Sequence, residues 1–164
     1  MDPMLEAARD LLLDRTPLKT DCGRLCGARC CNSLEGEESG MLLFPGEAEA
    51  YAGKPGWKVL DTEAGALLVC PGACDRAERP LACRVFPLLP VYRDEGIQTE
   101  PDERARGVCP LYRYGTEGMT DDFVAAVTQA GTLLCEDPAQ RGFLLRLTKE
   151  QDDLKQLRKT FGGR

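Results

Sequence analysis

Four of the nine cysteines in this chain lie within eleven residues, 21–31. Cys22, Cys26 and Cys30 recur at every fourth position, and Cys31 directly follows the last of them. Thiolates bind zinc and hold iron–sulfur clusters, so cysteines at this density indicate a set of metal ligands. Ligands that share a metal must converge, and the chain around this strip has to fold so that they can.

The conformation of the strip has two alternatives. If residues 22–30 are helical, a spacing of four places three sulfurs on one face. If Gly23 and Gly27 instead take positive φ angles, the strip folds as successive knuckles. Because each glycine disfavours a helix interior by about 1 kcal/mol, the sequence favours the knuckles.

A second group of cysteines lies in the middle of the chain, at Cys70, Cys74, Cys83 and Cys109. The Pro-Gly pair at 71–72 suits the central positions of a type II turn, which would bring the first two of these cysteines together. Such a turn would also direct backbone N–H groups at thiolate sulfur.

The two groups supply eight candidate ligands, and a tetrahedral zinc ion or a four-iron cluster takes four. The chain therefore has ligands for two centres, or for one centre with spare thiols. For any single cysteine the alternative is an inert position in the apolar core. We expect that position for Cys135, which follows Leu134 in an apolar helical pattern and has no partner at ligand spacing.

Composition narrows the chemistry. The chain has no histidine, which removes the commonest general base and the usual mixed zinc ligand, so a metal site must be built from sulfur, alone or with a carboxylate. A formal charge of −6 argues against a nucleic-acid partner, because binding to phosphate backbones requires a basic patch.

The sequence also predicts a cytoplasmic location. The apolar run 11–13 is too short for a signal peptide, and no stretch approaches the roughly 18 apolar residues of a membrane span. Thiols stay reduced in the cytoplasm, which favours metal ligands over a disulfide framework.

Arginines stand among and beside the cysteines, where they could offset the charge of about −2 that four thiolates leave around one divalent ion. These are Arg24, Arg29, Arg76, Arg79 and Arg84. We expect Arg79 and Arg84 to lie just outside the ligands of a bound metal or cluster and to tune it. The alternative is that they pair with Asp75 or Glu78 on the surface.

Helices are predicted at both ends of the chain. Asp2 caps a predicted amphipathic helix at 3–14, and a short helix is expected at 45–52, with Gly53 as its stop. Two more helices are expected at 120–136, capped by Thr120, and from residue 138 to about 161. The last of these carries a long apolar stripe of Leu144, Leu147, Leu154, Leu157 and Phe161, with a possible break near Thr148.

Two hairpins are predicted between the helices, from strands 57–60 and 66–70 and from strands 88–92 and 97–99. The fold class is therefore α+β. We expect one domain, 1–164, in which residues 22–110 form an irregular cysteine-cluster region and residues 119–162 form a helical part.

Three motifs resemble the YkgJ-type cysteine-cluster family, whose members are described as zinc- or iron-chelating domains. One is the strip 22–31, which ends in a Cys-Cys pair. The second is the block 79–87, Arg-Pro-Leu-Ala-Cys-Arg-Val-Phe-Pro, similar to the family's Arg-Pro-x-x-Cys-Arg-x-Phe-Pro pattern. The third is Cys109-Pro110, similar to the family's late Cys-Pro. The strip departs from the family in having three residues, and not two, between its first cysteines, which leaves open which cysteines share a metal.

The resemblance implies a cysteine-bound zinc or iron centre in a bacterial domain. A related pattern occurs in flagellin lysine N-methylases, where it implies an iron–sulfur centre. This chain is short for a cofactor-binding barrel around such a cluster, and the methylase activity is not carried over.

The leading hypothesis is a non-catalytic or accessory protein that holds or passes zinc or iron. The rival is an enzyme or electron-transfer protein with an iron–sulfur cluster. A third hypothesis is a structural zinc fold that binds an unidentified protein partner through its C-terminal helices.

Overall fold

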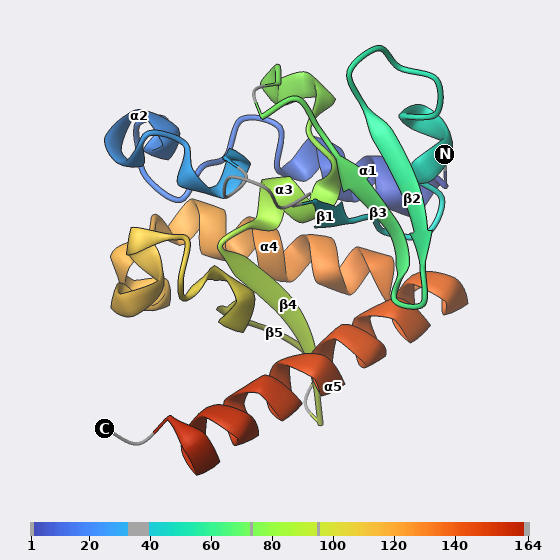
Figure 1. The fold of residues 1–164 in the computed structure, drawn as a ribbon. Coiled ribbons are helices and arrows are strands. Elements are labelled where there is room, and N and C mark those ends of the chain that lie inside the picture. The colour runs from blue at the N-terminus through green and yellow to red at the C-terminus, as the bar shows by residue number, and fades with distance from the viewer. Residues whose placement is uncertain (1, 33–39, 73, 95, 163–164) are drawn as a thin grey trace.

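The computed structural model describes residues 2–32, 40–72, 74–94 and 96–162. In these residues the protein is an α+β fold with five α-helices and two small antiparallel sheets, which confirms the predicted class (Figure 1). The elements are α1 (Pro3–Leu11), α2 (Cys22–Cys26), β1 (Met41–Leu42), β2 (Lys58–Thr62), β3 (Gly65–Val69), α3 (Leu81–Val85), β4 (Leu88–Arg93), β5 (Gly96–Pro101), α4 (Asp121–Leu134) and α5 (Pro138–Phe161).

Helix α1 begins where the sequence predicts and ends earlier. The Asp2 carboxylate accepts hydrogen bonds from the Met4 and Leu5 amides at 2.9 and 3.1 Å. The helix stops at Leu11 and not at residue 14, because the next amides bond to carbonyls three residues back and tighten the chain into a turn. Leu5, Ala8 and Leu12 are nevertheless fully buried, so the amphipathic character predicted for this segment is correct.

The first predicted hairpin is confirmed as β2 and β3. Its register runs from Lys58 opposite Val69 to Thr62 opposite Gly65. Strand β1 pairs with the other edge of β3, which gives the strand order β1-β3-β2. The sequence did not predict β1, because two residues are too few to show an alternating pattern.

The helix predicted at 45–52 is wrong. Only a 3-10 turn, Ala48–Ala50, is present. Gly46 has a φ of +86°, which a continuous helix excludes, and the Glu47 carboxylate turns back to accept the amide three residues before it at 3.1 Å. Gly53 does have the positive φ expected of a stop, +73°.

The second predicted hairpin is confirmed as β4 and β5, with a register from Leu88 opposite Pro101 to the tip. It lies between α4 and α5 (Figure 1). Helix α4 approaches it closely at Gly131, where an added Cβ would lie 2.6 Å from Pro90 Cβ and 2.8 Å from Ile97 Cγ2. A larger residue at this position would push the helix off the hairpin.

The main core is apolar and lies between α1, α3, β4, α4 and α5. Its fully buried large side chains are Leu5, Leu12, Leu81, Leu88, Val91, Phe123, Val127, Leu134 and Leu144. The half-buried Cys135, which follows α4, packs against this core, as the sequence predicts.

Helix α4 matches its prediction to within two residues at the C-terminal end. Thr120 precedes it with extended backbone, but no side-chain cap forms. The Thr120 hydroxyl donates instead to the Thr16 carbonyl at 3.1 Å, which ties the start of α4 to the segment after α1. Asp121 and Asp122 occupy the first turn, where they face the positive end of the helix dipole.

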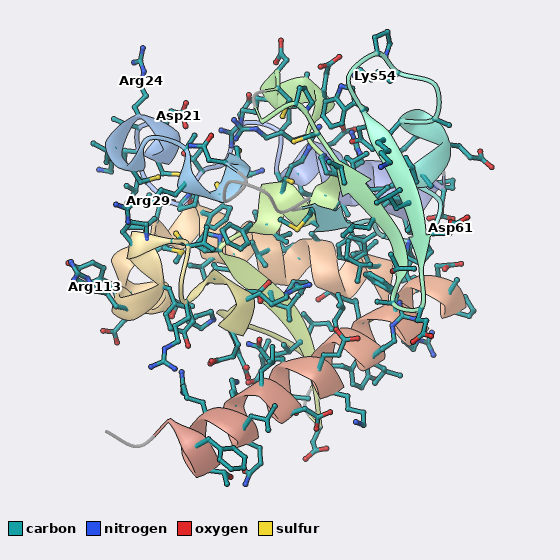
Figure 2. All side chains as sticks on the ribbon, in the orientation of Figure 1. Asp21, Arg24, Arg29, Lys54, Asp61 and Arg113 are labelled. Atoms are coloured by element: carbon teal, nitrogen blue, oxygen red, sulfur yellow. The ribbon has the colours of Figure 1, made fainter. Side chains whose placement is uncertain are left out.

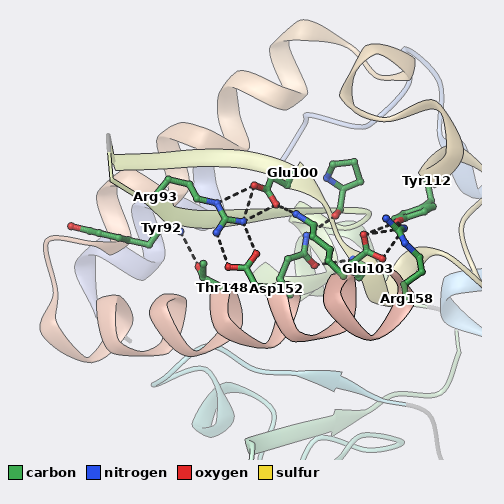
Figure 3. Close-up of polar contacts among 11 residues, drawn as sticks. Tyr92, Arg93, Glu100, Glu103, Tyr112, Thr148, Asp152 and Arg158 are labelled. Atoms are coloured by element: carbon green, nitrogen blue, oxygen red, sulfur yellow. Dashed lines mark hydrogen bonds and ion pairs between the residues drawn. The ribbon is translucent and has the colours of Figure 1, made fainter. Parts of the chain in front are cut away.

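Helix α5 is continuous through Thr148, so the break considered there is absent. The Thr148 hydroxyl donates to the Leu144 carbonyl at 2.8 Å and accepts the Tyr92 amide of β4 at 2.9 Å (Figure 3). Both bonds are compatible with helical backbone, and the second fastens the helix to the hairpin. Asp137 caps the start by accepting the Gln140 amide at 2.9 Å.

Polar contacts attach the second half of α5 to the hairpin and the turn that follows it (Figure 3). Arg93 of β4 bonds both Glu100 of β5 and Asp152 of α5, each at 2.8 Å. Farther along the helix, Arg158 pairs with Glu103 at 3.0 Å. Polar contacts thus hold the second half of α5, so the apolar stripe predicted along this helix is only partly correct.

The stripe changes character along α5. Leu144 and Leu147 are buried, whereas Leu154, Leu157 and Phe161 are 39%, 54% and 82% exposed. In the described part of the chain, no helix combines the length and apolar character required to cross a membrane.

Candidate metal centre

Two adjoining cavities lie where the predicted ligands come together. The larger, of about 150 Å³, is lined by five cysteines, which are Cys22, Cys26, Cys30, Cys83 and Cys109. The smaller, of about 100 Å³, is also lined by five, which are Cys30, Cys31, Cys70, Cys74 and Cys83. All eight predicted ligands thus line one cavity or both. They come from what we call the cysteine region, residues 21–32, 70–72, 74–85 and 106–114.

The sulfurs are near one another without forming a ligand shell. All nine cysteines are free thiols. The Cys30 and Cys31 sulfurs are 4.0 Å apart. Within the described residues, no group of three or more His, Cys, Asp or Glu side chains is placed so that it could hold a metal ion. The structure gathers the predicted residues around two cavities, and metal binding itself stays a prediction.

The first strip combines both conformations that the sequence allowed. Cys22 and Cys26 are the first and last residues of the single helical turn α2, in which Gly23 is helical and not a knuckle. Gly27 has the positive φ of a knuckle, +65°, and Ala28 follows with +52°. A left-handed alanine is strained by roughly 1–2 kcal/mol, and strain of this kind is commonest at functional sites.

The strip then closes on itself. A 3-10 turn, Arg29–Cys31, follows the left-handed pair, and the Cys31 amide donates to the Ala28 carbonyl at 2.8 Å. The Asn32 side-chain amide donates back to the Gly27 carbonyl at 2.9 Å. These bonds fix the direction of the chain at the adjacent cysteines.

The turn after β3 lies against this strip. Gly72 has the positive φ that the predicted turn requires, +87°. A Cβ at Gly72 would lie 3.3 Å from the Cys31 carbonyl oxygen, so the two segments are in contact there. Cys70 and Cys74 flank this turn, and both line the smaller cavity with Cys31.

The other two ligand candidates come from separate elements. Cys83 lies on α3, and burial raises the pKa of its thiol. Cys109 follows a 3-10 turn after β5, and burial raises its pKa as well. The backbone N–H groups of Leu111 and Tyr112 donate to the Cys109 sulfur and oppose that rise in pKa, which is how proteins stabilise a thiolate.

Neighbouring thiols influence one another. Burial raises the pKa of Cys22, and Cys26 and Cys109 raise it further. A hydrogen bond from the Cys30 thiol lowers the pKa of Cys31, with the Arg79 guanidinium acting in the same direction. The electrostatic neighbours of Cys22 and Cys31 are thus other cysteines, the Asp21 carboxylate, which raises both pKa values, and Arg79, which lowers them.

Arg79 faces the thiols. It lines both cavities. Its guanidinium donates to the Cys74 sulfur, while its buried Nε has no hydrogen-bond partner among the described residues. A buried donor without a partner is costly, at about 1–3 kcal/mol. Arg79 therefore lies beside the candidate ligands, and its influence on a bound metal stays a prediction.

Arg84 lines the larger cavity, but each of its side-chain nitrogens binds a backbone carbonyl. Its three nitrogens donate to the carbonyls of Arg79, Arg9 and Ala77 at 2.8–2.9 Å. Arg84 therefore joins α1 to the segment before α3, and its place is that of a structural residue more than of a group that tunes a metal.

The remaining arginines divide in the same way. Arg76 holds backbone, donating to the Leu13 and Arg15 carbonyls at 2.6 Å. Arg24 and Arg29 are exposed and point outward at the edge of the molecule (Figure 2). Glu78 was considered above as a surface partner of Arg79 or Arg84. Its carboxylate pairs with Lys54, at 2.6 Å.

The sequence missed Glu47, whose carboxylate is fully buried beside the cysteine region. It accepts hydrogen bonds from Arg9 at 2.6 Å, from the Leu81 amide at 2.8 Å and from the Phe44 amide at 3.1 Å. It thereby holds the start of α3, and with it Cys83, in place. No sequence signal marked it, because a glutamate there fitted a helix that does not form.

Comparisons of the chain with protein-family models, with curated proteins and with solved structures found no match. The likeness to cysteine-cluster proteins therefore rests on the three motifs in the sequence.

Proposed function

We propose that the protein binds zinc or iron through its eight clustered cysteines, in a non-catalytic or accessory role. One observation carries this proposal. Eight cysteines from four separate segments of the chain line two adjoining cavities, and the ninth packs on the apolar core. Chance placement of inert cysteines gives no reason for eight to meet and one to be left apart.

The donor chemistry supports a thiophilic metal. Sulfur is the donor that both cavities share, and the chain has no histidine to mix with it. Four thiolates suit zinc or an iron–sulfur cluster. The Arg79 guanidinium lies along both cavities, where it would offset the negative charge that such a centre carries.

The weak packing of the cysteine region supports a structural role for the metal. No residue is buried in α2, nor in the 3-10 turns Arg29–Cys31, Arg76–Glu78 and Pro110–Tyr114. These segments gain little from apolar burial. A structural zinc site contributes about 10–16 kcal/mol in small peptides, comparable to the whole stability of a domain.

A second candidate function is electron transfer or catalysis by an iron–sulfur cluster. The observation that favours it is the buried Nε of Arg79, a residue that lines both cavities, because this atom has no hydrogen-bond partner in the part of the chain that the structure describes. A donor there could bind a cluster sulfide, and hydrogen bonds to cluster sulfur set the reduction potential.

Metal analysis of anaerobically purified protein tests the proposal and separates the candidates. Zinc in stoichiometric amount and no colour support the first. Brown protein with iron and acid-labile sulfide supports the second. The Cys135→Ser variant is the matched control and should keep the full metal content. Protein that is metal-free as isolated, and that takes up neither zinc nor iron with sulfide, would refute both.

A further inference from the structure

Each cavity is lined by three cysteines that do not line the other cavity. For the larger cavity these are Cys22, Cys26 and Cys109, and for the smaller they are Cys31, Cys70 and Cys74. A tetrahedral thiolate site requires four ligands. Each cavity is thus one ligand short of a complete set, and the two remaining cysteines, Cys30 and Cys83, line both.

The shared cysteines can be assigned by their place in the chain. Cys30 belongs to the strip that gives Cys22 and Cys26 to the larger cavity. Its neighbour Cys31 lines only the smaller cavity and is the ligand that the strip supplies there. We therefore assign Cys30 to the larger cavity, which leaves Cys83 to complete the smaller.

The backbone allows the adjacent pair to serve different sites. Cys30 and Cys31 lie in a 3-10 turn. With three residues per turn, successive side chains leave such a turn about 120° apart. One strip can therefore supply ligands to two cavities, and the contact of Gly72 with the Cys31 carbonyl holds the second ligand segment against Cys31.

We propose that the eight thiols form two separate four-cysteine centres. The two centres meet where the peptide bond joins Cys30 to Cys31. The first centre consists of Cys22, Cys26, Cys30 and Cys109, and the second of Cys31, Cys70, Cys74 and Cys83. This inference rests on the proposed function and deepens it by stating how many metals bind and which cysteines hold each.

The first experiment counts cobalt(II), a spectroscopic probe of thiolate sites, bound by the anaerobic, reduced protein. The wild type and Cys135→Ser should each bind two equivalents, with absorption typical of tetrahedral thiolate coordination. Cys109→Ser and Cys70→Ser should each bind one. The double variant should bind none.

The second experiment identifies the ligands. Cobalt-loaded protein is treated with iodoacetamide, and the alkylated cysteines are mapped by mass spectrometry. In Cys109→Ser, the four cysteines of the second centre should be protected, while Cys22, Cys26 and Cys30 react. In Cys70→Ser, the four cysteines of the first centre should be protected.

Three results would overturn the division. They are one cobalt per wild-type chain, loss of both ions in each single variant, and protection of Cys22 or Cys26 in Cys109→Ser. In any of these cases the protein still binds metal, so the proposed function survives. A wild type that binds no cobalt, zinc or iron would instead remove the proposed function itself.

Should a variant fail to fold, the wild type alone decides the matter. A chelator added stepwise to the cobalt-loaded protein should release metal in two steps, and the cysteines should become reactive in two groups of four. Reaction of all eight in a single step would contradict two separate centres.

Discussion

The molecule is held together in two different ways. The main core joins α1, α3, β4, α4 and α5 through closely packed apolar side chains, and six of the fourteen residues of α4 are buried. The cysteine region consists of short turns, and apart from Pro80 and α3 its described residues bury no side chain. The main core can fold by excluding water, whereas the cysteine region has thiols where a core would be.

The difference indicates where the stability of the main core and of the cysteine region comes from. Burial of apolar surface stabilises a fold by about 25 cal/mol per Å², and α4 and α5 gain from it directly. A turn of three to five residues with exposed side chains gains almost nothing in this way and is marginal alone. In the cysteine region a bound metal would replace the missing core. Metal removal should therefore destabilise the cysteine region before the main core.

Metal removal is expected to have the largest effect, confined at first to the cysteine region. With chelator and reductant, or with Cys26→Ser and Cys74→Ser combined, we expect a steep fall in melting temperature. The loss should reach several kcal/mol, because metal binding is also folding free energy. Amide hydrogen exchange should rise in the cysteine region while α4 stays protected. An unchanged melting curve for metal-free protein would show that the region folds without metal.

Removal of the buried Glu47 carboxylate, which lies between the main core and the cysteine region, should have the next largest effect. Glu47→Ala leaves Arg9 and the Leu81 amide without their buried partner, and breaking a buried pair costs about 3–5 kcal/mol. Urea unfolding of the metal-loaded protein measures this loss. The exposed Glu49 is the matched control, and Glu49→Ala should change the free energy of unfolding by less than about 0.5 kcal/mol. Equal effects of the two substitutions would mean that Glu47 does not join the main core to the cysteine region.

The smallest expected effect belongs to the polar contacts of α5 and depends on pH. Burial opposes ionisation of Glu100, but hydrogen bonds from Lys155 and Arg93 outweigh it and lower the pKa of this carboxyl. A lowered pKa in the folded state stabilises the protein above the unfolded value of about 4.3, and this contribution is lost as the pH falls through the folded pKa.

Glu100→Gln should therefore lower the free energy of unfolding by about 1 kcal/mol at pH 7. The difference from wild type should shrink as the pH falls below about 4, because the wild-type carboxyl is then protonated as well. Metal loss in acid affects both proteins and cancels in the comparison. The exposed Glu117 serves as the control for removal of a charge. A difference that stays constant down to pH 3 would contradict the assigned ion pairs.

Local patterns in the sequence were enough for most elements. Capping at Asp2 and Asp137, the two hairpins and both C-terminal helices follow from interactions between residues close in the chain. The errors lie where distant contacts outweigh local preference. Glu47 leaves a helical pattern to bind α1 and α3, and Thr148 bonds to β4 without breaking its helix.

The same division holds for the candidate site. The spacing of the cysteines identified all eight cysteines that line the cavities and set Cys135 apart, because residue type and density are properties of the chain alone. The grouping of those cysteines came from tertiary structure. Cys109 reaches the first strip, and Cys31 reaches Cys70 and Cys74, only because the hairpins and α3 bring segments together that are 39 or more residues apart. No local spacing encodes such a contact, since it depends on how the apolar core positions the segments around it.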